Sequence, residues 1–405
     1  MKNVSITSPE FKADPYPFYA RLRAEEPVCP VMLPDKRTAW IVTRYDDAVA
    51  VLKDERFAKD RFKTLTPEQI AKQPWIPKMF MPLVRNMLDL DPPDHTRLRA
   101  LVHKAFTPRL VEEMRERVQT LTDELLDAVE ARGRMDLIRD YAVPLPTTII
   151  AQMLGVDPAD RHRFHRWTSA IVSSTNSRWG MLLILPKGIA FLRFIRRLIK
   201  ARRADPRDDL TTALVQAEEA GEKLSEDELV AMIFVLLVAG HETTVNLIGN
   251  GMLALLEHTD QLEKLRNDPA LIKSAVEELL RYASPVETGT ERFAREDVTI
   301  GSVTIPRGAL VLVALASADR DERQFENPDT LDIKRESSKH LAFGQGVHYC
   351  LGAPLARLEG QIAISTLIRR FPELRLEVAP AELRWKPGLV MRGLAALPVA
   401  FTRRG

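Results

Sequence analysis

The stretch Phe343-Gly344-Gln345-Gly346-Val347-His348-Tyr349-Cys350-Leu351-Gly352 carries the strongest signal in this chain. Two glycines so close together permit a tight loop with unusual backbone angles. Cys350 follows that loop, and a helix is predicted from about Pro354 to Arg370. A thiolate at this position would face open backbone N–H groups and the positive end of the helix, which stabilise the anion. The stretch therefore predicts an activated thiol at a junction between a loop and a helix.

Three other interpretations of Cys350 remain open from the residues alone. A single cysteine is usually a small buried hydrophobic residue. A cysteine before a helix can also be a nucleophile activated by a neighbouring base, here His348. Zinc is poorly supported, because the chain has only one further cysteine, Cys29, and so lacks a second cysteine pair. Two cysteines also build no disulfide framework, which favours a reducing cytoplasm.

The flanking residues extend the pattern, since Leu355-Ala356-Arg357 and Glu359 follow the loop at fixed spacing. The whole pattern resembles the haem-binding loop of soluble bacterial cytochromes P450. The resemblance implies haem b (iron protoporphyrin IX) as cofactor, with Cys350 as the axial ligand of the iron. The thiolate of such a ligand pushes electron density toward iron and favours cleavage of the O–O bond. The resemblance also implies that Phe343 packs beside the sulfur and that His348 binds a haem propionate.

The composition is that of a folded protein with a large core. The chain has 405 residues, of which 45% are hydrophobic and 28% charged, and its formal charge of +2 gives no strong attraction to nucleic acid. The longest apolar run, Ala231 to Gly240, is too short to span a bilayer, so we expect a buried helix and no transmembrane anchor. Helices dominate and strands lie toward both ends, which predicts a mainly α (α+β) chain. The expected strands include Ala39–Thr43, Val298–Ile305 and Leu310–Ala314, and a further helix is expected to start at Asp268-Pro269. The resemblance implies the cytochrome P450 fold as a single domain over residues 1–405.

A long helix is predicted to begin at the capping box Ser225-Glu226-Asp227-Glu228 and to end near His258. It is apolar on nearly all sides up to Ala239, as in a helix that crosses a protein core. Its middle, Ala239-Gly240-His241-Glu242-Thr243-Thr244, could be a simple kink with threonines bonding to the preceding turn. The segment resembles the oxygen-binding segment of the family. Gly240 would leave room for O₂, while Thr243 with Glu242 would organise water and deliver protons.

Cationic side chains are expected around the haem propionates. His95 and Arg99 are four residues apart and share one helix face, which on its own predicts a solvated basic surface. By resemblance, His95, Arg99 and Arg292 join His348 as propionate partners, since two carboxylates attract several cationic donors. Glu278 and Arg281 match the buried Glu-x-x-Arg motif of the family and would be structural. Asp319 stands where the family usually has Asn, which could alter the hydrogen bonds of a local turn.

The resemblance also places mostly apolar segments above the haem. The predicted substrate contacts are Leu236, Ala239, Val286, Gly289 and Met391. Such a lining fits a lipophilic substrate, for example a macrolide, steroid, terpene or fatty acid. The stretch from Trp179 to Arg203 is basic and amphipathic, and we interpret it as a helix with a solvated basic face rather than a membrane-surface helix.

Together these features predict a monooxygenase that hydroxylates or epoxidises a lipophilic molecule with O₂. The residues after Cys350 contain no flavin or iron–sulfur module. NAD(P)H electrons are therefore expected through a ferredoxin and its reductase, which could dock at Lys104, Arg109 and Arg357 on a cytoplasmic, monomeric protein. A haem protein that senses gas or carries electrons would not need the proton residues around Thr243. A cysteine-nucleophile enzyme would give no role to the Gly240 or Arg292 segments.

Overall fold

The computed structural model describes residues 4–65, 68, 70, 77–160, 163, 167, 178–219, 224–336 and 339–402. The chain forms two compact units, each built from separate stretches. The first unit comprises Met1–Lys72, Val118–Pro144 and Thr243–Gly405, and the second comprises Gln73–Arg117 and Leu145–Glu242. The single domain over residues 1–405 stays a prediction.

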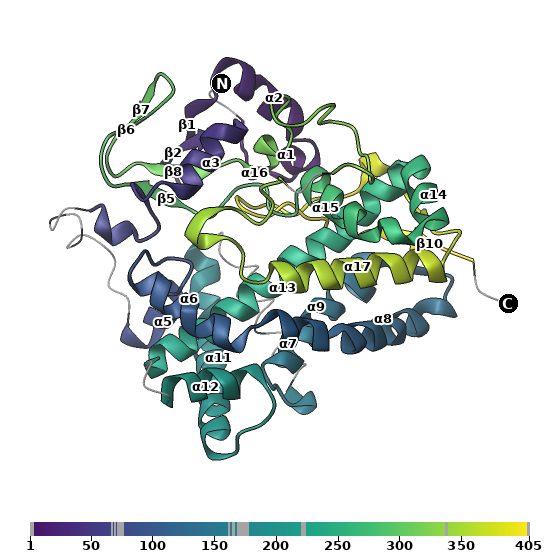
Figure 1. Ribbon diagram of the computed structural model, residues 1–405, viewed down its shortest axis with the longest axis horizontal. Coiled ribbons are helices and arrows are strands. Elements are labelled where there is room, and N and C mark those ends of the chain that lie inside the picture. Colours follow the sequence, from purple (N-terminus) through teal and green to yellow (C-terminus); the bar gives the residue numbers. More distant parts are fainter. Residues whose placement is uncertain are drawn as a thin grey trace. The chain divides into compact units, whose positions relative to one another are not determined.

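The first unit contains a five-stranded sheet in the order β1-β2-β8-β5-β3 (Figure 1). Its strands are β1 (Val28–Met32), β2 (Thr38–Val42), β8 (Leu310–Val313), β5 (Arg292–Ala294) and β3 (Phe57–Ala58). β2 and β8 are parallel and place Ile41 beside Leu312, and the other pairs are antiparallel. β8 is buried along its whole length, as expected for a central strand. The two predicted strands near Ala39 and Leu310 are confirmed.

One predicted strand is wrong in detail. Residues 298 to 305 were expected to be a single strand before a turn at Pro306, but they form a hairpin of β6 (Val298–Ile300) and β7 (Val303–Ile305). Gly301 turns the chain at a φ of 57°, a left-handed conformation that glycine adopts at little cost. The shift of the apolar positions from 298 and 300 to 303 and 305 matches this two-residue connection.

Helices contain more residues of the first unit than strands do. α15 (Ile272–Ala283) packs against α17 (Ala353–Arg370), and α2 (Tyr16–Glu25) and α3 (Tyr45–Lys53) pack against the short α16 (Leu315–Ala318). As predicted, Asp268 caps the start of the α15 region, where its carboxylate accepts the Ala270 N–H at 3.2 Å. The remaining elements are α1 (Pro9–Ala13), α8 (Arg115–Glu130), α14 (Thr259–Asn267), β4 (Arg134–Asp136), β9 (Arg375–Leu376), β10 (Pro398–Ala400), the π-helix η3 (Ile138–Ala142) and the 3₁₀ turns η1 (Arg61–Lys63), η5 (Pro269–Leu271), η6 (Gly346–His348) and η7 (Pro380–Glu382).

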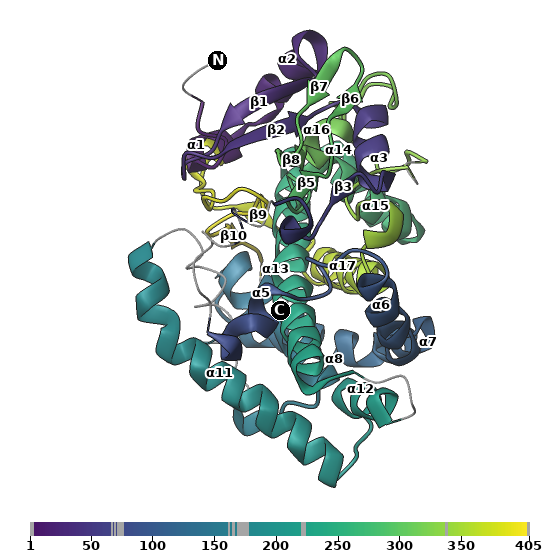
Figure 2. The same cartoon turned by 90° about the vertical axis from the view of Figure 1, so that its left-hand side faces the viewer.

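The second unit is helical. The long helix α11 (Arg178–Ala204) packs against α12 (Leu210–Glu219), and α12 packs against α6 (Asp94–Ala105) (Figure 2). Arg202 fastens this corner, because its buried guanidinium pairs with Asp209 and donates to the Gly155 carbonyl at 2.5 Å. The other elements here are η2 (Lys78–Phe80), α5 (Met81–Val84), α7 (Pro108–Glu113), α9 (Pro144–Met153) and η4 (Pro158–Asp160). The predicted basic face of α11 is partly neutralised, since Arg196 pairs with Glu226 and Asp227.

The long predicted helix is α13 (Glu226–Glu257). Its capping box is confirmed, because the Ser225 hydroxyl accepts the Glu228 N–H at 3.2 Å and the Glu228 carboxylate accepts the Ser225 N–H at 2.8 Å. The helix continues through Gly240 without a break. By length and composition α13 could cross a membrane, but 61% of its most apolar window is buried, as expected for a core helix.

Candidate functional site

The loop before Cys350 is as tight as its glycines predict. Gly344 and Gly346 have φ values of 68° and 75°. A Cβ at Gly346 would lie 2.7 Å from the Leu52 carbonyl oxygen, so only glycine fits there without displacing backbone. The Cys350 N–H donates to the Phe343 carbonyl at 2.9 Å and closes the loop. Cys350 is partly exposed and lies three residues before α17, where a ligand can reach its sulfur.

Arg292 and the cysteine loop meet at one backbone carbonyl. The buried Arg292 guanidinium, on β5, donates to the carbonyls of Phe57 at 3.2 Å and Leu52 at 3.3 Å. The same Leu52 carbonyl faces Gly346 in the turn that carries His348. The fold therefore brings the predicted propionate partners Arg292 and His348 to one corner of the first unit, from positions far apart in the sequence.

The outer side of the loop packs around Phe343. The ring of this buried residue is flanked by His340 at 5.8 Å and Tyr349 at 6.3 Å between ring centroids, and the Arg357 guanidinium lies 4.5 Å from its centroid. All four side chains line a pocket of about 330 Å³. No sequence pattern marks His340 as a site residue, because its contact with Phe343 depends on how the loop folds.

Glu277, which the sequence did not single out, fixes this cluster from α15. Its carboxylate accepts two hydrogen bonds from Arg357, at 2.7 and 2.8 Å, and one from His340 at 3.0 Å. Burial by itself raises the pKa of Glu277, but the bonds from His340 and Arg357 outweigh it and hold the pKa at about 2. The carboxylate is therefore ionised. Its only sequence signal is that it precedes Glu278 of the Glu-x-x-Arg motif.

The Glu278–Arg281 pair is buried, as predicted. Two hydrogen bonds of 2.7 and 2.8 Å join the side chains, and both are completely shielded from solvent. Arg281 also donates to the carbonyls of Asp319, Pro328 and Thr330. The same-spaced pair Glu112/Arg115 lies at the surface, and Glu263/Arg266 joins an exposed carboxylate to an arginine that is 20% exposed. The buried pair thus ties α15 to the segment leading into the cysteine loop.

One face of α13 carries the predicted oxygen and substrate residues. Leu236, Ala239, Gly240 and Thr243 lie at positions i, i+3, i+4 and i+7, which share one helix face. All four are only half-buried, as is Glu242, whereas Leu237, His241 and Thr244 are buried. The His241 ring bonds the Leu237 carbonyl at 2.8 Å. The predicted face is therefore half-accessible, and Phe234 and Val238 on another side of the helix are half-buried as well.

His95 and Arg99 lie one turn apart on α6, as their spacing predicts. His95 is 1% exposed and Arg99 is half-buried. Burial, and then the nearby Arg99 charge, lower the pKa of His95. Burial and the Arg99 charge both disfavour a further positive charge at this position. An anionic group would therefore bind there more readily than a cationic one.

Three predicted substrate contacts come together in the first unit. Val286 and Met391 face each other in an antiparallel bridge, and the Gly289 N–H donates to the Val313 carbonyl at 2.8 Å. Val286, Gly289 and Met391 are half-buried. The resemblance also implies lining from the segments 61–87 and 167–194, and part of each lies outside the described residues.

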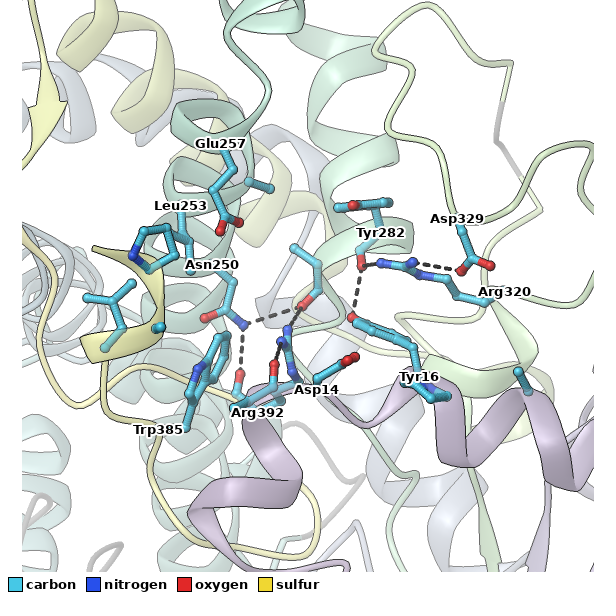
Figure 3. Close-up of a pocket in the computed structure, with 18 residues that line it drawn as sticks. Asp14, Tyr16, Asn250, Leu253, Glu257, Tyr282, Arg320, Asp329, Trp385 and Arg392 are labelled. Atoms are coloured by element: carbon cyan, nitrogen blue, oxygen red, sulfur yellow. Dashed lines mark hydrogen bonds and ion pairs between the residues drawn. The ribbon is translucent and has the colours of Figure 1, made fainter. Parts of the chain in front are cut away.

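A second pocket, of about 610 Å³, contains none of the predicted site residues. Figure 3 shows its walls, in which the Arg320 guanidinium stacks 3.7 Å from the Tyr16 ring centroid and 4.0 Å from that of Tyr282. Arg392 stacks on Trp385 at 3.9 Å and donates to backbone carbonyls. Arg320 and Arg392 thus hold separate segments of the chain together, which is a structural role.

The donor set at Cys350 fits a haem. Among the described residues there is no group of three or more His, Cys, Asp or Glu that could hold a bare metal ion. A single accessible thiolate suits a metal that arrives with its own ring of nitrogen ligands. The loop that contains Gly344 and Gly346 would supply that thiolate. Arg292 and His348, which lie near the Leu52 carbonyl, would bind the propionate carboxylates of a haem.

Comparisons with known proteins agree with this geometry. The family model described as Cytochrome P450 matches residues 189–392. The chain is 48% identical to Cytochrome P450 107B1 of Saccharopolyspora erythraea over 96% of this chain and 95% of that protein. It is 47% identical to Cytochrome P450 monooxygenase PikC of Streptomyces venezuelae over 97% of this chain and 92% of the relative. The structure of PksS, a cytochrome P450 of the Bacillus subtilis bacillaene polyketide synthase, superposes with a TM-score of 0.92 at 43% identity, covering 99% of this chain and all of that one.

Proposed function

This chain belongs to the cytochrome P450 family, and from that premise we propose that Cys350 ligates the haem iron and Thr243 delivers protons at the oxygen site. The mainly α fold with small sheets is the fold of the family. The protein is a haem-thiolate monooxygenase that inserts one oxygen atom of O₂ into a lipophilic small molecule, with NAD(P)H electrons delivered through partner proteins. The observation that carries the site assignment is the loop that presents the partly exposed Cys350 directly before α17.

The remaining haem contacts follow the donors in the structure. We assign Phe343 to the side of the sulfur and His348, Arg292, His95 and Arg99 to the two propionates. The meeting of Arg292 with the cysteine loop at the Leu52 carbonyl supports this assignment. When bound, the haem supplies the redox chemistry of oxygen activation, while the protein supplies position and electrostatics.

The half-buried face of α13 would handle O₂ and protons. Gly240 has no side chain, so it leaves space beside the helix. The Thr243 hydroxyl can both donate and accept a hydrogen bond, so it can hold a water and pass on its proton. Glu242 is adjacent and can resupply that proton from solvent, since it is half-exposed.

The substrate would lie against the apolar residues of the same site. Leu236, Ala239, Val286, Gly289 and Met391 offer small or aliphatic surfaces, which orient a lipophilic molecule such as a macrolide, steroid, terpene or fatty acid by shape. The bridge between Val286 and Met391 supports placing both in one wall.

Electron transfer requires a docking partner, and we propose a ferredoxin served by its reductase for a monomeric, cytoplasmic protein. Of the three cations predicted to bind it, Arg109 pairs with Glu113 and Arg357 pairs with Glu277. The cysteine loop itself exposes Val347 and Tyr349, to 51% and 39%. These two side chains would therefore contribute to docking beside the predicted cations.

Carbon-monoxide difference spectra of the reduced holoenzyme test the ligand. We expect the thiolate-specific Soret band that gives the family its name, and its loss in Cys350→His. Persistence of that band in Cys350→His would overturn the assignment. A preparation from haem-replete cells that carries no haem would instead support a cysteine nucleophile.

The proton assignment is tested by coupling. We expect Thr243→Ala to form less product per NAD(P)H oxidised, by roughly tenfold or more, and to release peroxide, since general acid catalysis typically contributes 10²–10⁴-fold. Thr244→Ala is the matched control, because Thr244 is buried on another face of α13. Equal coupling in both variants would remove Thr243 from the mechanism.

A further inference from the structure

A charged pair lies against the outer side of the cysteine loop. The Arg357 guanidinium faces the Phe343 ring at 4.5 Å, within the range of a cation–π contact. Phe343 in turn holds Cys350, because its carbonyl accepts the Cys350 N–H at 2.9 Å. Arg357 and Cys350 therefore both contact Phe343, Arg357 through the ring and Cys350 through the backbone carbonyl.

The position of Arg357 is set by three contacts. Glu277 binds the guanidinium through two hydrogen bonds of 2.7 and 2.8 Å, and the Tyr349 hydroxyl lies 3.3 Å from its third nitrogen. The side chains of Arg357 and Glu277 are 30% and 23% exposed, so solvent screens them only in part. A fixed, partly shielded charge acts on its neighbours much more strongly than a mobile surface charge does.

His340 is the third side chain of this cluster. Its Nδ1 accepts the Ala342 N–H at 3.2 Å, which assigns the ring proton to Nε2. That Nε2–H donates to Glu277 at 3.0 Å. Within this described cluster, Arg357 is the cation next to Phe343. Glu277 is the anion that binds Arg357 from α15.

We propose that the Glu277–Arg357 pair tunes the reduction potential of the haem bound at Cys350. The inference rests on the proposed function, since it assumes that Cys350 ligates the iron. One-electron reduction, with the electron supplied by the redox partner, makes the haem–thiolate unit more negative. The guanidinium favours that reduced state, and Glu277 opposes it while holding the guanidinium against Phe343.

A purely structural clamp predicts something different. If the pair only held the loop in shape, removal of either partner would disturb the thiolate in the same way. Electrostatic tuning predicts shifts of opposite sign, because one partner is a cation and the other an anion. The sign of the shift therefore separates the two explanations, and activity is not needed for the measurement.

The experiment is a redox titration of the substrate-free holoenzyme, followed by its absorption spectrum. We expect Arg357→Gln to lower the midpoint potential and Glu277→Gln to raise it, each by a several-fold change in the reduction equilibrium, where tenfold equals 59 mV for a one-electron couple. Arg357→Lys keeps the charge and should retain most of the wild-type potential. Lys264→Gln and Asp260→Asn make the same charge changes at an exposed pair on α14 and should shift the potential far less.

Shifts of the same sign in Arg357→Gln and Glu277→Gln, or shifts no larger than those of the α14 controls, would overturn the proposal. Loss of the thiolate-specific carbon-monoxide band in both variants would do so as well, because it would identify a structural clamp. Absence of that band in the wild-type protein would instead refute the ligation by Cys350, so the failure of the proposed function is recognised separately.

Discussion

Asp319 places a carboxylate where an asparagine would place a neutral amide, in the buried turn before the cysteine loop. Its buried carboxylate accepts the Leu341 N–H at 2.6 Å, and its carbonyl accepts a bond from Arg281. Burial raises the pKa of Asp319 to about 7, although His340 and the Leu341 N–H act in the opposite direction. An asparagine would accept the same N–H without a titrating group. The aspartate therefore makes the turn that leads into the cysteine loop sensitive to pH.

We expect Asp319→Asn to remove this pH dependence. An unfolded aspartate has a pKa of about 3.9, so between pH 4 and 7 the folded protein retains a proton that the unfolded chain has lost. The free energy of unfolding of the wild type then falls as pH rises through that window, by at most about 1.4 kcal/mol per pH unit. Urea unfolding at pH 5 and pH 7.5 should show the variant gaining on the wild type at the higher pH. A difference that is equal at both pH values would contradict the assignment, and Asp329→Asn, at an exposed carboxylate, is the control.

The two loop glycines differ in a way that a pair of alanine substitutions reveals. Gly344 and Gly346 both have positive φ, but a Cβ at Gly344 meets nothing within 4 Å while one at Gly346 meets the Leu52 carbonyl. Alanine at positive φ costs roughly 1 kcal/mol, and a clash with backbone adds to that. We expect Gly346→Ala to lower the ratio of Soret to protein absorbance strongly and Gly344→Ala to lower it mildly. Equal haem occupancy in the two variants would show that contact with Leu52 is unimportant.

At the scale of elements, the short helix α1 is fastened to the predicted substrate segment by a buried ion pair. Lys12 on α1 and Glu287, next to Val286, are fully buried and lie 2.9 Å apart. The Tyr19 hydroxyl on α2 donates to the same carboxylate at 2.7 Å. Burial raises the pKa of Glu287 and lowers that of Lys12, so each charge depends on its partner. The pair specifies where α1 docks, because a misplaced helix would leave one charge alone in the core.

A double-mutant cycle measures that dependence. We expect Lys12→Met to lower the free energy of unfolding by about 3–5 kcal/mol, because it leaves Glu287 buried without its cation. Lys12→Met combined with Glu287→Gln should recover much of the loss, since the amide still accepts the Tyr19 hydroxyl. The exposed pair of Arg56 and Asp54 serves as control, where removal should cost no more than about 1 kcal/mol. Simple additivity at Lys12 and Glu287 would mean that the two charges do not support each other.

At the scale of the whole molecule, the sequence predicted what is encoded locally. The capping box of α13, the buried strand at Ala39 and the glycine loop before Cys350 each follow from neighbouring residues, and the structure has all three. The contacts of Leu52 with Gly346 and of Glu277 with Arg357 join residues that are distant in the chain, and no periodicity marks them. The hairpin at Gly301 is also local, since the apolar positions shift from 298 and 300 to 303 and 305 across the Gly301-Ser302 turn. Site chemistry was thus predictable where a motif was contiguous, and its supporting contacts were not.

The longest-range contacts join the N-terminal segment to the chain near residue 390. Arg392 donates to the carbonyls of Lys12 at 2.8 Å and Ala13 at 3.1 Å, and the Gly388 N–H donates to Thr7 at 3.0 Å (Figure 3 shows Arg392). Arg392 directly follows Met391, which bridges Val286. The first residues of the chain therefore support a wall of the proposed substrate site.

We expect Arg392→Gln to loosen that wall. The substitution removes donors from buried carbonyls, so amide hydrogen exchange should accelerate over residues 286–289 and 388–391 and over α1 together, because the Glu287 N–H bonds the Val390 carbonyl. The hairpin of β6 and β7 shares none of these bonds and should exchange as in the wild type. Faster exchange confined to residues near 392, with α1 unchanged, would mean that the two ends of the chain are not coupled. A coupled response would instead explain how residues some 380 positions apart keep Met391 and Val286 in register.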